Sequence, residues 1–99
     1  MILITGTFRI PADALERARP IMEAMIAASR KEDGCLAYTY APDLIDDTLI
    51  HVVERWTTRE ALDRHFASDH LAEWRAAFPT LGITDRALEL FEVDGGEAT

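Results

Sequence analysis

The chain has 99 residues, so it forms one domain and has no room for a second hydrophobic core. Hydrophobic residues make up 48% of it, which allows a compact core and excludes wholesale disorder. The net charge is −8 at pH 7, and an acidic surface repels phosphate, which argues against nucleic acid and anionic membranes as partners.

Hydrophobic periodicity predicts four strands and three helices in the order β-α-β-β-α-α-β. The strands are expected over residues 1–10, 35–41, 48–57 and 83–93. The helices are expected from Asp13 to about Gly34, after Thr57, and from Ser68 to Pro79. A single domain over residues 1–93 is therefore expected, followed by a flexible polar tail over residues 94–99.

Capping signals predict where the helices begin. Asp13 precedes Glu16 at the spacing of a capping box, which predicts the start of the first helix. Thr57 and Glu60 repeat this spacing at the second helix, and Ser68 is the expected N-cap of the third.

Proline and glycine are expected to bend or end these helices. Pro20 lies inside the first helical pattern and removes one backbone hydrogen bond, so a kink near residues 17–20 or a new start at Pro20 is expected. Gly34 is expected to end the first helix as a C-terminal cap, and Pro79 to close the third.

The element order is that of a ferredoxin-like, split βαβ α+β fold, an antiparallel sheet with helices on one face. The open face of such a sheet is polar where it meets water. Here Ile50, Val52 and Trp56 lie on one side of the third strand, and the apolar Leu49 and Val53 lie on the other. We expect a second copy of the chain to cover the open face in a homodimer. The alternative is a sheet with scattered exposed aliphatic residues.

Motifs for bound cofactors and metals are absent from the sequence. It has no phosphate-binding glycine loop, no His-Glu-x-x-His, no Cys-x-x-Cys and no nucleophile elbow. Redox chemistry then requires an electron-rich substrate or a cofactor held without a known motif. His65 and His70 are five residues apart, which places them on different faces of one helix, and Ser68 breaks the helix between them. No metal site is therefore expected.

The single cysteine, Cys35, excludes an internal disulfide framework and fits a reducing cytosol. It has no neighbouring base in the sequence, which favours a structural thiol over a nucleophile. The longest apolar runs are far short of the roughly 20 residues that span a bilayer. Residues 1–5 lack the basic region of a signal peptide, so a cytoplasmic location is expected.

His65 is the most serious candidate for chemistry. It shares the expected buried face of its helix with Leu62 and Phe66, so its imidazole is expected to point at the sheet. A buried histidine needs a partner, because an unmade hydrogen bond costs about 1–3 kcal/mol. His65 serves either as a bracing core residue or as a proton acceptor in a pocket between helices and sheet.

Further candidates lie on the strands and on the third helix. Glu54 and Trp56 are two residues apart on one strand and share a face, where a carboxylate is either paired or part of a pocket wall. Tyr38, Trp74 and Phe78 either line a cavity for a flat, apolar ligand or fill the core.

Three sequence blocks resemble the antibiotic biosynthesis monooxygenase (ABM) family. Residues 32–38, Glu-Asp-Gly-Cys-Leu-Ala-Tyr, resemble its Glu-Pro-Gly-Cys-Leu-x-Tyr element, with aspartate where the family usually has proline. Residues 54–65 resemble its second element, a Glu-x-Trp run followed by a helix that ends in histidine, here His65. Residues 68–70, Ser-Asp-His, resemble the third.

The resemblance covers about residues 1–93 and implies a dimeric α+β barrel made by two ferredoxin-like sheets. Members of the family include cofactor-free oxygenases of phenols, quinols and aromatic polyketides. Others degrade haem, isomerise small sugar-like signals or have no known activity. Haem-degrading members use an Asn, Trp and His set, and the first strand here has no asparagine, which disfavours that activity.

We therefore expect a small cofactor-independent monooxygenase acting with O₂ on a quinol, phenol or aromatic polyketide-like substrate. His65 is expected to help remove a hydroxyl proton, with Tyr38 or Trp56 orienting the ring. The residues expected to contact the substrate are Glu54, His70, Trp74, Arg75 and Phe78. The alternatives are a non-catalytic ligand-binding or structural dimer, and a cofactor-free isomerase or lyase acting on a small carbonyl compound.

Overall fold

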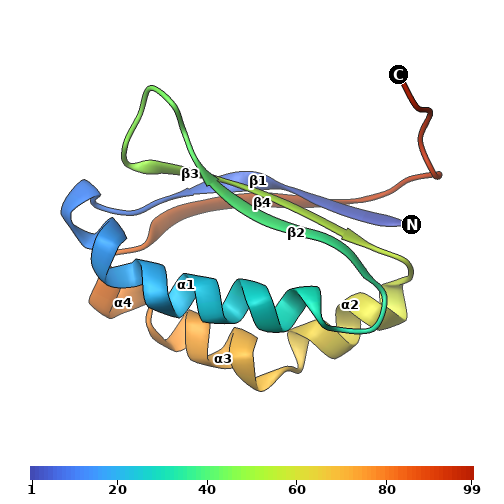
Figure 1. The fold of residues 1–99 in the computed structure, drawn as a ribbon, viewed down its shortest axis with the longest axis horizontal. Coiled ribbons are helices and arrows are strands. Elements are labelled where there is room, and N and C mark those ends of the chain that lie inside the picture. The colour runs from blue at the N-terminus through green and yellow to red at the C-terminus, as the bar shows by residue number, and fades with distance from the viewer.

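Four antiparallel strands form one sheet, and all the helices lie on the same face of it (Figure 1). The computed structural model describes residues 1–99. Its elements are, in chain order, β1 (Ile2–Arg9), a 3₁₀ turn (Ala12–Ala14), α1 (Leu15–Arg30), β2 (Cys35–Pro42), β3 (Leu49–Trp56), α2 (Arg59–Phe66), α3 (Asp69–Ala76), α4 (Phe78–Leu81) and β4 (Thr84–Glu92).

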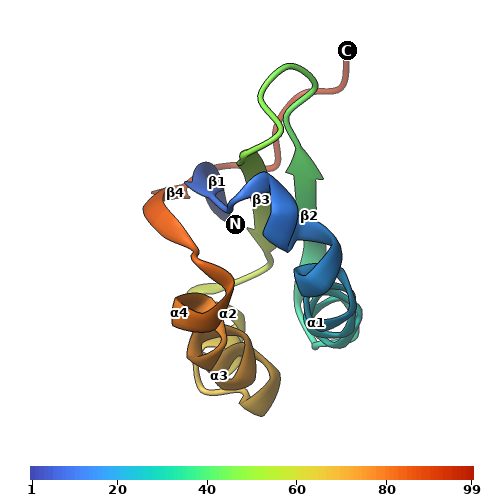
Figure 2. The same cartoon turned by 90° about the vertical axis from the view of Figure 1, so that its left-hand side faces the viewer.

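The strand order in the sheet is β2-β3-β1-β4, and every neighbouring pair is antiparallel. The central strand β1 pairs with β3 on one side and with β4 on the other, so Ile4 lies opposite both Glu54 and Leu90. Below the sheet, α1 lies beside the group formed by α2, α3 and α4 (Figure 2). This arrangement confirms the predicted ferredoxin-like α+β fold.

The core lies between the sheet and the helices. On β3, Ile50, Val52 and Trp56 are at most 1% exposed, whereas Val53, which points to the other face, is 39% exposed. The division of this strand predicted from its alternating pattern is therefore confirmed. Fully burying a side chain such as Ile50 stabilises the fold by about 1.5–3 kcal/mol.

The other face of the sheet has no cover within this chain (Figure 1). Leu3 and Phe91 lie opposite each other on β1 and β4, and Phe91 is 42% exposed. Val53 of β3 adds a third apolar side chain to this open face. The homodimer that would cover these residues stays a prediction.

Two of the three predicted helix starts are wrong. Asp13 makes no capping hydrogen bond, because residues 12–14 form a 3₁₀ turn ahead of α1. The N-cap of α2 is Thr58, whose hydroxyl accepts from Ala61 N at 3.1 Å. Thr57 instead donates its backbone N–H to Gly34 O. Ser68 caps α3 as predicted, with its hydroxyl accepting from Leu71 N at 3.4 Å.

The expected effects of proline and glycine on the helices also need correction. α1 is continuous from Leu15 to Arg30, so no new helix starts at Pro20. It ends before Gly34, which lies in the following turn with a φ of +86°. Pro79 belongs to the short helix α4 and does not close α3. Proline fits in the first turn of a helix, because backbone N–H groups there have no partner within the helix.

Residues 94–99 form neither helix nor strand (Figure 1), and all six are exposed. None of the helices combines the length and the apolarity that a span across a bilayer requires.

Candidate active site

A cavity of about 240 Å³ lies between the sheet and helices α2, α3 and α4. The candidates from the sequence that line it are Tyr38, Glu54, His65, Trp74, Arg75 and Phe78. The other lining residues are Ile4, Tyr40, Phe66, Leu71, Arg86, Leu88, Glu89 and Leu90. The structure places Trp56 and His70 outside this lining, so any effect that they have on a ligand passes through a neighbour.

His65 projects from α2 into the aromatic floor of the cavity and is 1% exposed. Its ring centroid lies 4.7 Å from that of Trp56 and 5.2 Å from that of Tyr38. Its Nδ1 atom lies 2.8 Å from Glu32 Oε1. The imidazole is therefore held on three sides, which restricts it to one orientation at the cavity wall.

The two nitrogens of the His65 ring have different surroundings. A carboxylate only accepts hydrogen bonds, so the contact with Glu32 places the ring proton on Nδ1. Nε2 makes no hydrogen bond to the protein. Every fully buried side-chain nitrogen or oxygen in the structure has a hydrogen-bond partner, so Nε2 is not fully buried. Nε2 therefore reaches the cavity and carries a lone pair there, as a proton acceptor requires.

Burial lowers the pKa of His65 below its ordinary value of 6.5, because the charged imidazolium loses hydration. The hydrogen bond and the charge of Glu32 oppose this effect and raise the pKa. His65 is therefore neutral at neutral pH, and the nearby carboxylate stabilises the cation once a proton arrives.

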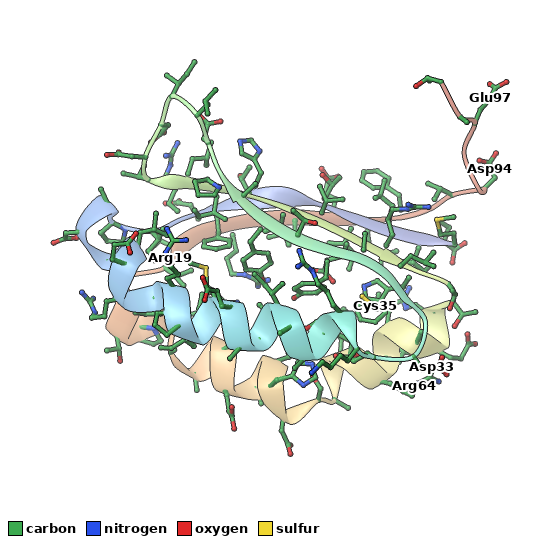
Figure 3. All side chains as sticks on the ribbon, in the orientation of Figure 1. Arg19, Asp33, Cys35, Arg64, Asp94 and Glu97 are labelled. Carbon is green, nitrogen blue, oxygen red and sulfur yellow. The ribbon has the colours of Figure 1, made fainter.

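Glu32 is the site residue that sequence reasoning missed. It lies in the turn after α1, and the left-handed Gly34 two residues later allows that turn to pack tightly on α2. A Cβ at residue 34 would lie 2.6 Å from Ala61 Cβ. The neighbouring Asp33 lies 4.0 Å from Arg64 of α2 at the same end of the molecule (Figure 3). The only sequence signal was that Glu32 opens the first ABM-like block.

His70 also binds Glu32, through Nε2 and the same Oε1 atom. The expectation that His65 and His70 lie apart was wrong, because it took the helix break at Ser68 to separate them. The break at Ser68 starts α3 in a new direction, and α3 brings His70 back towards α2.

Glu32, His65 and His70 are the residues that could hold a divalent metal ion. One ligand atom from each lies within 4.8 Å of the others. Carboxylate oxygen and imidazole nitrogen are donors that zinc and other transition metals accept. In the structure these atoms hydrogen-bond to one another, with Glu32 Oε1 accepting from both imidazoles.

Glu54 is a second carboxyl group at the cavity, and it is 5% exposed. Trp56 Nε1 donates a hydrogen bond to Glu54 Oε1 at 3.1 Å. Burial raises the pKa of Glu54, while this hydrogen bond and the positive charges of Arg86 and Arg75 lower it. Trp56 therefore positions Glu54 and also packs against the ring of His65.

Tyr38 and Tyr40 form a stacked pair on β2, with ring centroids 5.7 Å apart. Burial raises the pKa of both phenols above the ordinary value of 10, so both are protonated at neutral pH. Neither phenol can therefore act as a base, and the Tyr38 hydroxyl is hydrogen-bonded to that of Tyr40. Burial also raises the pKa of the Cys35 thiol, which agrees with a structural role for that residue.

The sequence profile of the ABM family, described as antibiotic biosynthesis monooxygenase, matches residues 1–77. Rv0793 of Mycobacterium tuberculosis, whose name reads "Putative monooxygenase", is 33% identical over 75 residues, which are 76% of this chain and 73% of that protein. The chain belongs to the antibiotic biosynthesis monooxygenase family. Protein sll1783 of Synechocystis is 26% identical over 92 residues, or 93% of this chain, which spans only 63% of that relative's length.

Solved structures of similar proteins have the same fold. A Deinococcus radiodurans protein described as a "putative antibiotic biosynthesis monooxygenase" superposes with a TM-score of 0.88 at 28% identity, over 100% of this chain and 96% of that one. Rv0793 superposes with a TM-score of 0.83 at 28% identity, over 98% of each chain. The family resemblance and the fold predicted from the sequence are therefore confirmed.

Proposed function

We propose that the protein is a cofactor-independent monooxygenase that oxidises a compact quinol or phenol with O₂. The observation that carries this proposal is the placement of His65, with Nδ1 on Glu32 and Nε2 open to the cavity. Family membership supports the reaction class. The volume of about 240 Å³ is below the roughly 300–1,000 Å³ of most ligand pockets, which favours a compact ring system.

The first step is removal of a proton from the substrate hydroxyl. His65 Nε2 accepts this proton, and the Glu32 carboxylate stabilises the resulting imidazolium through Nδ1–H. The phenol group of Tyr40 stays protonated and can donate a hydrogen bond to the phenolate oxygen. The apolar and aromatic side chains that line the cavity exclude water from the anion and hold the ring for reaction.

The substrate anion then supplies the electrons that reduce O₂. For a quinol, the overall reaction gives a hydroxyquinone and water. One oxygen atom forms the new bond to a ring carbon and the other leaves in water. The two hydroxyl protons and the displaced ring hydrogen are divided between water and the new hydroxyl group. Atoms and electrons therefore balance without an external reductant, and the protein contributes positioning, desolvation and proton transfer.

We also propose that the working unit is a homodimer in which a second copy covers the open face of the sheet. The support is the apolar group formed there by Leu3, Val53 and Phe91, which nothing in one chain covers. Covering apolar surface stabilises association by about 25 cal/mol per Å² of area removed from water, before the entropic cost of association.

The test is oxygen uptake with a panel of quinols and phenols, measured on protein treated with a chelator. The expected result is substrate-dependent uptake that survives chelation, with one atom from ¹⁸O₂ in the product. Turnover of a small carbonyl compound without O₂ would instead assign the same base to an isomerase or lyase. Binding without turnover of either class would assign the domain to ligand binding.

A further inference from the structure

Two arginines at the cavity have no ion pair or hydrogen bond within the protein. The chain has nine arginines, and seven of them make at least one such contact. The exceptions are Arg75 on α3 and Arg86 on β4, and both line the cavity beside His65. In a protein of net charge −8, two unpaired guanidinium groups at one cavity are a distinctive feature.

Each of these arginines is held by an aromatic ring. The guanidinium carbon of Arg75 lies 5.8 Å from the ring centroid of Phe66, and that of Arg86 lies 5.4 Å from the ring centroid of Phe78. A guanidinium that contacts an aromatic face is attracted by its π-electrons, while the N–H donors at its edge stay free. The two side chains are therefore restrained without losing the donors that bind an anion.

The charges around the two arginines do not neutralise them by direct contact. Glu54 and Glu89 are the acidic residues that line the same cavity, and neither forms an ion pair with Arg75 or Arg86. The positive charges of both arginines lower the pKa of Glu54, so both lie close enough to this buried carboxyl group to act on it. A negatively charged group of a ligand at the cavity could accept hydrogen bonds from the free N–H donors of the two arginines.

We propose that the substrate is a hydroxylated aromatic carboxylic acid, whose carboxylate binds Arg75 and Arg86 while its ring lies against Tyr38 and Trp74. The assignment of a hydroxylated ring rests on the proposed function, whereas the assignment of a carboxylate rests on the two arginines alone. The planar fork of a guanidinium matches the two oxygens of a carboxylate. The same contacts would distinguish an acid from its ester, which has the same ring and no charge.

The experiment compares 2,5-dihydroxybenzoate with its methyl ester in equilibrium titrations without oxygen, followed by tryptophan fluorescence. The acid is expected to bind about tenfold more tightly than the ester at low salt, and the preference is expected to shrink as salt rises. Arg75→Gln and Arg86→Gln should each remove most of this preference. Arg59→Gln is the control, because it makes the same charge change at an exposed residue outside the cavity.

The proposal is overturned if the acid binds no more tightly than the ester, which includes the case in which neither binds. It is also overturned if the two cavity variants keep the preference of the wild type. If the acid binds through the arginines in these titrations but the separate oxygen-uptake assay shows no consumption of O₂, the carboxylate site is supported and the monooxygenase proposal fails. Circular dichroism of each variant checks that the fold is intact.

Discussion

Glu32 and His65 are 33 residues apart in the chain, and Glu32 Oε1 lies 2.8 Å from His65 Nδ1. The contact selects the tautomer of His65 and leaves its Nε2 as the acceptor at the cavity. The role of Glu32 therefore depends on its charge as well as its shape.

Glu32→Gln tests this role. An amide can donate to Nδ1 and stabilise the opposite tautomer, which removes the lone pair from Nε2, so turnover should fall at least about tenfold. Loss of the carboxylate also lowers the pKa of His65, because Glu32 raises it. The rising limb of the pH–rate profile should therefore move to lower pH. A profile with the wild-type height and midpoint would contradict the assigned role.

His65→Gln tests the base itself. The substitution keeps most of the side-chain volume but removes the proton acceptor, so oxygen-dependent turnover of a quinol should fall by about 10²–10⁴-fold. His51→Gln is the matched control, since His51 is exposed on β3 and pairs with Asp43 away from the cavity. Wild-type turnover by a folded His65→Gln variant would reduce His65 to a bracing residue.

The lowered pKa of His65 predicts how stability depends on pH. The unfolded chain binds a proton near pH 6.5, whereas folded His65 binds it only at lower pH. The free energy of unfolding should therefore fall as the pH drops below about 6.5, and this loss should level off once the pH is below the folded pKa. Urea denaturation at pH 7.5 and pH 5.5 measures the difference.

His65→Gln should reduce the pH-dependent loss of stability, because the variant has no imidazole to protonate at this position. His51→Gln should retain it. The raised pKa of Glu54 acts in the opposite sense, since its contribution is lost as pH rises through its folded pKa. Equal losses in the wild type and in His65→Gln would assign the effect to another group.

Gly34→Ala tests how the turn that carries Glu32 is held against α2. The new Cβ would lie 2.6 Å from Ala61 Cβ and 2.7 Å from Thr57 Oγ1, in a backbone conformation with φ of +86°. Strain of this kind costs about 1–3 kcal/mol, and displacement of Glu32 should lower turnover as well. Gly95→Ala, at a residue with nothing within 4 Å, should change neither quantity.

The open face of the sheet predicts a homodimer. Light scattering should give twice the chain mass of 11.1 kDa at micromolar concentration. Val53→Asp, which places a charge on this face, should shift the mass to that of one chain. Ile21→Asp is the control, because Ile21 is 40% exposed on α1, on the helical side of the sheet. A monomeric wild-type protein would refute the proposal.

Local patterns in the sequence determined most of the fold. Alternation along β3 and the three-to-four-residue spacing of α2 and α3 depend only on neighbouring residues, so they predicted the elements, their order and the buried position of His65. Helix boundaries were less accurate, since they depend on single hydrogen bonds. Thr57, for example, donates to Gly34 O across the fold, and Thr58 takes the capping role.

Only the tertiary structure decided how the site is completed. Glu32 reaches His65 because a turn packs on α2, and His70 joins them because α3 changes direction at Ser68. Arg86 meets the same cavity as Arg75 because β4 pairs with β1 at the edge of the sheet. These contacts join residues that are distant in the chain, and no local periodicity encodes them.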